Sequence, residues 1–183
     1  HRGAVQVHDR VEESLMPIDK FVADLKSGGV ARVPGAAVFL TRAKTGAPPV
    51  MVWHVKHNRS LHEYVVVLTL TVMSVPRVDE ADRLVLTKVA PKFWRAEVRY
   101  GFIEHPDIQG VLAESKALGC EIDLDDVTYY VGHETIVPRE DGRGLPRWQE
   151  TLFAAMGRNA ARISDFLELP HDQVVEIGRQ ISI

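Results

Sequence analysis

Apolar residues recur every three or four positions along the start of the chain. This spacing is that of one face of an amphipathic helix, and it is carried by Val7, Val11, Leu15, Ile18, Val22 and Leu25. Pro17 interrupts the pattern and Gly28-Gly29 ends it. The sequence therefore predicts an N-terminal helical arm over residues 1–31, followed by a domain over residues 32–183.

Segments rich in β-branched residues follow the arm and predict strands. Val33–Thr41 is a short apolar run opened by Pro-Gly, and Tyr64–Val75 is dominated by valine, leucine and threonine. Asp82–Val89 and Phe93–Phe102 alternate moderately and are joined by only three residues, which predicts an antiparallel hairpin. Two more strands are predicted at Val127–Val137 and Val174–Ile183.

Helical patterns separate several of these strands. Pro48-Pro49 introduces a predicted helix at Val50–His57, and the longest predicted helix runs from Leu145 to about Leu167. Another begins at Pro106-Asp107 and ends at Gly119, with an apolar face of Ile108, Val111, Leu112 and Leu118. Strands alternating with helices, together with a hairpin, predict an α/β fold with a mixed β-sheet flanked by helices.

Composition narrows the class of protein. The 183 residues are 45% hydrophobic and 26% charged, as in an ordinary globular domain. A net charge of -3 gives no field that would attract a polyanion, so we expect no nucleic-acid partner. The single cysteine, Cys120, forms no internal disulfide and fits a reducing compartment. The longest uncharged apolar stretch, Tyr64–Pro76, is shorter than the roughly 20 residues of a membrane-spanning helix.

The candidate catalytic and metal-binding motifs are weak. His54, His57 and His62 lack the spacing of a zinc-binding helix, so we expect them to cap a helix and bond a loop rather than hold a metal. The four acidic residues Glu121, Asp123, Asp125 and Asp126 lack calcium-loop register and predict a solvated loop. No G-x-S-x-G turn occurs and Cys120 lies among acids, so we expect no catalytic residue, no cofactor and no enzymatic activity.

A nucleotide pocket without a strong motif stays open as an alternative. Neither G-x-G-x-x-G nor the phosphate loop G-x-x-x-x-G-K-[ST] occurs in the chain. The carboxyl ends of parallel strands nevertheless form a crevice in open α/β sheets, and Lys56, His57 and Asn58 are expected near such an end. These three residues and His62 are the candidates for ligand binding or for an interdomain contact; the alternative is a structural turn.

Six strings in the chain resemble, in order, the C-terminal cytosolic domain of the KUP/HAK/KT potassium uptake transporters, in particular the bacterial Kup type. They are RVPGAAVFLT (32–41), KHNRSLHEYVVVLTLTV (56–72), FWRAEVRYGF (93–102), TYYVGHETIVP (128–138), LFAAMGRNA (152–160) and LPHDQVVEIGRQISI (169–183). The residues before Arg32 are similar to the family's linker out of its last membrane helix. Trp53-His54 and His171-Asp172 depart from the family's pattern.

The resemblance implies a potassium uptake transporter, coupled to protons, whose membrane portion and transport residues lie outside this sequence. It implies a domain at the cytoplasmic face of the inner membrane that packs under its own transmembrane portion, pairs as a homodimer, and regulates or assembles the transporter. The alternative that it implies is a universal-stress-like module that senses a nucleotide ligand such as cyclic di-AMP.

Overall fold

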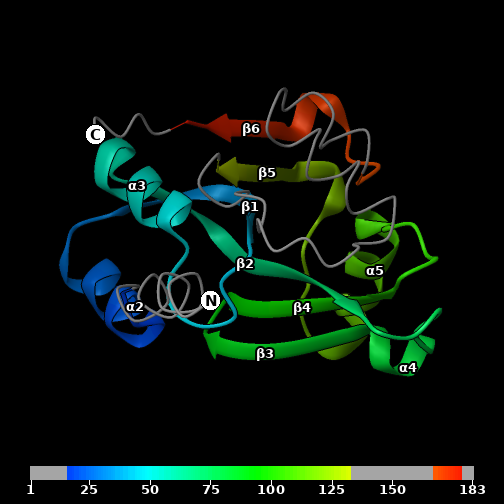
Figure 1. Cartoon of the computed structure of the whole chain (residues 1–183). Coiled ribbons are helices and arrows are strands. Elements are labelled where there is room, and N and C mark those ends of the chain that lie inside the picture. Colours follow the sequence, from blue (N-terminus) through cyan, green and yellow to red (C-terminus); the bar gives the residue numbers. More distant parts are fainter. Residues whose placement is uncertain (1–15, 133–166, 179–183) are drawn as a thin grey trace.

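The computed structural model describes residues 16–132 and 167–178. These residues form a mixed six-stranded sheet in the order β3-β4-β2-β1-β5-β6 (Figure 1). The strands are β1 Ala31–Thr41, β2 Ser60–Met73, β3 Leu84–Ala90, β4 Phe93–Gly101, β5 Val127–Gly132 and β6 Val174–Ile177. Only the β3–β4 pair is antiparallel, and the other four pairs are parallel. The predicted α/β class with a mixed sheet is confirmed.

Helices cover both sides of this sheet. They are α2 Ile18–Ser27, α3 Pro49–Asn58, α4 Glu80–Arg83 and α5 Ile108–Glu114, the last continued by a 3-10 turn at Ser115–Leu118. Figure 1 shows α2 and α3 on one side, called here the α2/α3 side, and α5 on the opposite side. The chain crosses from β1 to the parallel β2 through α3, and from β4 to β5 through α5.

The central strands are buried on both faces. Phe39 and Val67 pack on the α2/α3 side, whereas Val38 and Val66 pack on the α5 side, and all four are fully buried. This is why Val33–Thr41 and Tyr64–Val75 read as nearly continuous apolar runs rather than as alternating patterns.

The predicted hairpin is present, with one correction at its start. Its turn contains Lys92 in a left-handed conformation with φ of 59°. The first strand begins at Leu84 rather than at Asp82, because residues 80–83 form the short helix α4. Arg83 in this helix donates a hydrogen bond to the carbonyl of Val78, which holds the turn in place.

The described part of the predicted arm packs on the sheet. Pro17 precedes α2 and Gly28 follows it, as the sequence predicted. The helix buries Phe21, a residue outside the predicted stripe, edge-on against Phe93 of β4 with ring centroids 6.4 Å apart. The carbonyl of Met16 accepts a hydrogen bond of 2.8 Å from the Ala47 amide. The predicted helical stripe before Met16 lies outside the described residues, and the domain boundary at residue 32 stays a prediction.

The remaining predicted elements are partly described. Ile108, Val111 and Leu112 are buried on α5, but Leu118 is 59% exposed because the helix tightens into a 3-10 turn and rotates it off that face. The helix predicted from Leu145 lies outside the described residues up to 166, and the last two strands are described only to Gly132 and Ile177. No helix within residues 16–132 and 167–178 is long and apolar enough to cross a membrane.

Candidate functional site

The predicted contact residues of α3 lie at the amino edge of the parallel strands. Lys56, His57 and Asn58 form the exposed last turn of α3, directly before β2. The Ala31 amide at the start of β1 donates to the carbonyl of Arg59 at 3.0 Å, which fixes the turn at this edge. The expected location at the carboxyl ends of the strands is wrong, because α3 runs back from the end of β1 to the beginning of β2.

The fourth candidate, His62, lies on β2 near the same edge. Its ring centroid is 6.0 Å from that of Tyr130, and its Nδ1 atom is buried without a hydrogen-bond partner. Burial lowers the pKa of His62, the carboxylate of Asp126 opposes this shift, and the Arg32 guanidinium adds to it. His62 is therefore neutral at pH 7.

The other two histidines of the group face different surroundings. His54 is buried against Tyr130, with ring centroids 4.7 Å apart, and its Nδ1 lies 3.0 Å from the Asn58 side-chain nitrogen. Burial and then the neighbouring His62 lower the pKa of His54. His57 is exposed and stacks on Trp53 at 4.4 Å. In the described part of the chain, no group of three or more histidine, cysteine or acidic side chains could hold a metal ion.

The acidic residues near Cys120 take part in turn formation. The Asp123 carboxylate accepts a 3.0 Å hydrogen bond from the Asp125 amide and so caps a 3-10 turn at Leu124–Asp126. Asp126 lies against Gly35, whose φ of 94° suits glycine. Cys120 is fully buried, and burial raises the pKa of its thiol, which disfavours the thiolate that a nucleophile needs.

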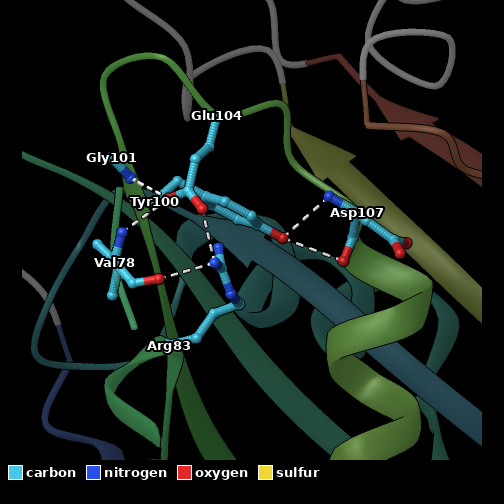
Figure 2. Close-up of polar contacts among 6 residues, drawn as sticks. All are labelled: Val78, Arg83, Tyr100, Gly101, Glu104 and Asp107. Atoms are coloured by element: carbon cyan, nitrogen blue, oxygen red, sulfur yellow. Dashed lines mark hydrogen bonds and ion pairs between the residues drawn. The ribbon is translucent and has the colours of Figure 1, made fainter. Parts of the chain in front are cut away.

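A connected network of polar side chains lies at the opposite, carboxyl edge. Figure 2 shows Glu104, in the loop after β4, accepting hydrogen bonds from the amides of Gly101 at 2.7 Å and Val78 at 3.0 Å. Arg83 donates to the same carboxylate at 2.7 Å, and both side chains are largely buried. Glu104 therefore joins the loops that follow β2 and β4.

Tyr100 extends this network toward α5. Its hydroxyl donates to the carbonyl of Asp107 at 3.0 Å and accepts from the Asp107 amide at 2.9 Å (Figure 2). Burial raises the pKa of Tyr100 to about 12, and the Arg83 guanidinium lies 5.1 Å from its ring centroid. The loops approach so closely that a Cβ on Gly101 would lie 2.2 Å from the carbonyl oxygen of Pro76. The arrangement is suited to holding two loops rigid.

A second polar cluster lies on the α2/α3 side of the same strands. Glu97 on β4 accepts hydrogen bonds from Thr71 at 2.7 Å and from Arg99 at 2.9 Å. The Arg99 hydrogen bond is the main cause that lowers the pKa of Glu97. Two positions earlier, Arg95 points toward the loop between β1 and α3 and donates to its carbonyls. The apolar cover of this side therefore gives way to polar contacts toward the carboxyl edge.

Sequence reasoning identified the helix start at Pro106-Asp107 but missed the network beside it. Arg83 and Glu104 are 21 positions apart, and their pairing leaves no local pattern. The alternation of charged residues with apolar ones along β4 signals a polar strand face, but it does not identify the partners of those charges.

Replacing Glu104 with glutamine keeps the shape of the side chain and removes its charge. We expect the free energy of unfolding at pH 7 to fall by about 2 kcal/mol, because hydrogen bonds to charged groups are among the stronger ones. The Arg83 hydrogen bond is the main cause that lowers the pKa of Glu104 to about 2 from an ordinary 4.5. This stability is present above the ordinary value and is lost as the pH falls toward 2. Urea unfolding at several pH values should therefore show that the free energy of unfolding falls less in acid for the variant than for the unchanged chain.

Glu63→Gln is the matched control. Glu63 pairs with Lys92 at 3.1 Å, but both side chains are about half exposed, so its loss should cost below about 1 kcal/mol. Equal effects of the two substitutions would contradict the structural role given to Glu104.

Comparison with known proteins matches this chain to one family. The sequence model for the K+ potassium transporter C-terminal domain matches residues 34–183. A probable potassium transport system protein Kup 1 of Bradyrhizobium sp. (strain ORS 278) is 59% identical over the whole chain. A protein of the same description from Geobacter sulfurreducens is 39% identical over 182 residues, and a Kup 3 protein of Legionella pneumophila (strain Lens) is 39% identical over 183.

The chain spans 29% of the length of each of these relatives. No solved structure matches it. The resemblance given by the six strings is confirmed, and the chain belongs to the family of C-terminal domains of K+ potassium transporters.

Proposed function

We propose that this chain is the cytosolic C-terminal domain of a proton-coupled potassium uptake transporter, and that it regulates or assembles the membrane portion. The supporting observation is the match of the whole chain to only 29% of relatives named as potassium transport system proteins. The ion path would then lie in the remaining length, with this domain at the cytoplasmic face of the membrane. Its first partner would be its own transmembrane portion, reached through the arm.

The rigid carboxyl edge supports such a role. Loops that couple the movements of two parts of a protein must hold their shape. Glu104 joins two loops by accepting hydrogen bonds from the Arg83 guanidinium and from the amides of Val78 and Gly101. The polar groups of this edge bond one another and the backbone, an arrangement that suits a regulatory body better than turnover of a substrate.

Nucleotide sensing is the second candidate. The loop between β1 and α3 follows the carboxyl end of a central parallel strand, the region where open α/β sheets bind nucleotides. Exposed Arg42 and Lys44 on this loop have the charge that phosphate groups require. This candidate concerns control of the same transporter, and the two functions are compatible.

Deleting residues 32–183 from the full-length transporter tests the proposal. We expect the membrane portion to insert normally and the rate of potassium uptake into vesicles to change several-fold, because the regulatory body is gone. Immunoblotting of the membrane fraction controls for insertion. Uptake indistinguishable from that of the intact transporter would refute the proposed role. Cyclic di-AMP inside the vesicles separates the candidates: sensing requires an effect on the intact transporter that the deletion abolishes.

We propose the last turn of α3 as an interdomain contact. Lys56 and His57 are exposed there, and Asn58 bonds His54 behind them, so the turn presents the Lys56 ammonium and an imidazole at the amino edge. Reversing the charge with Lys56→Glu should alter uptake without changing the thermal unfolding of the chain, since exposed substitutions change stability little. Lys116→Glu, exposed beyond α5, is the control. An effect on uptake no larger than that of the control would exclude this contact.

We also propose that the domain pairs with a second copy. The described apolar side of α2 is already packed on its own sheet, so α2 does not offer this side to a second copy. An outermost described strand of the sheet is the proposed contact instead. β3 is such a strand, and its Val85 is 39% exposed. Sedimentation of the 183-residue chain at micromolar concentration should give a dimer that Val85→Lys dissociates and Leu118→Lys does not. A monomer before any substitution would reject pairing.

A further inference from the structure

Arg95 joins β4 to the loop between β1 and α3. Its guanidinium extends past β2, which separates β4 from β1, and Nη1 donates to the carbonyls of Ala43 at 3.0 Å and Lys44 at 2.9 Å. Nη2 donates to the carbonyl of Gly46 in the same loop. Three carbonyls separated from Arg95 by about fifty positions in sequence therefore converge on one cation.

Arg95 is held by backbone oxygens. The described hydrogen bonds of its guanidinium all go to carbonyls, and the nearby Glu97 is bonded by Arg99 and Thr71. Burial lowers the pKa of Arg95, although the guanidinium remains charged. A planar group with several donors can bond three carbonyls together, whereas a lysine ammonium is a compact charge on a flexible stem. The geometry therefore fixes the shape of the loop.

The same loop also holds the arm. Thr41 accepts a hydrogen bond from the Ala43 amide at 3.1 Å, and Thr69 donates to the Ala43 carbonyl at 3.2 Å, which anchors one end of the loop to the sheet. At the other end, the amide of the fully buried Ala47 donates to the carbonyl of Met16 at 2.8 Å. The loop thus lies between the sheet and the start of α2.

β4 consequently holds the arm at two points. Phe93 contacts Phe21 of α2 directly, and Arg95, two residues later on the same side of the strand, acts through the loop and Met16. Side chains two apart on a strand share a face, so both contacts move with one rigid element.

We infer that Arg95 is a positioning residue that couples the sheet to the arm through the loop between β1 and α3. A displacement of the arm at Met16 is then transmitted to the carboxyl ends of the central strands, and a change at those ends is transmitted back to the arm. The coupling is a property of the chain itself. Its consequence for transport rests on the proposed function, in which the arm leads to the membrane portion.

Hydrogen exchange of the 183-residue chain tests this coupling. Arg95→Ala should speed exchange of the Ala47 amide and of the α2 amides by about tenfold or more, because the loop loses charged hydrogen bonds. Amides of β1 and β2 should stay protected, whereas general destabilisation would speed them as well. Arg95→Lys should restore protection only in part. Arg99→Ala, on the same strand and side, is the control and should leave α2 unchanged.

A double substitution identifies the route of the effect. Phe21→Ala removes only the direct contact with β4, so adding Arg95→Ala should speed α2 exchange further and also expose the Ala47 amide, because the loop and Met16 form a separate attachment. An unchanged α2 in Arg95→Ala, or no further effect of Arg95→Ala in the Phe21→Ala background, would overturn the coupling. Altered exchange in the chain with unchanged uptake by the full-length transporter would instead count against the proposed regulatory role.

Discussion

The double-sided burial of β1 and β2 is the constraint on which the rest of the fold depends. Both strands carry bulky apolar residues on both faces, so each face needs its own cover. α5 supplies it on one side, and α3 together with α2 supplies it on the other. The described part of the arm is therefore part of the core, since Phe21 completes the cover over the start of β4. The described part of the predicted amphipathic stripe, at Ile18, Val22 and Leu25, packs against the same side of the sheet.

The apolar cover ends toward the carboxyl edge, and polar contacts replace it there. Arg95, Glu97 and Arg99 alternate with apolar residues along β4, so one face of a single strand is apolar at Phe93 and charged beyond it. Each of these charges has a partner within reach, as buried polar groups require. The loops at this edge are consequently held by long-range hydrogen bonds. Loops held in this way move together with the sheet as one rigid unit.

The amino edge has a different character. His54 and His62 are neutral and partly enclosed there, while Lys56 and His57 face outward. The two edges thus differ: the amino edge presents the exposed Lys56 and His57, whereas hydrogen bonds join the loops at the carboxyl edge.

The sequence by itself determined the class of fold, the hairpin and the family. Continuous apolar runs require burial on both faces, and Pro48-Pro49, Pro106-Asp107 and Gly119 start or end helices through the local geometry of proline, aspartate and glycine. Only the tertiary structure decided which edge α3 reaches, that Phe21 is the buried residue of α2, and that Leu118 faces solvent. It also decided the partners of Arg95 and Glu104, which lie about fifty and about twenty positions away in sequence. Periodicity reports which face of an element is apolar, whereas the pairing of distant polar groups depends on how the elements are arranged in space.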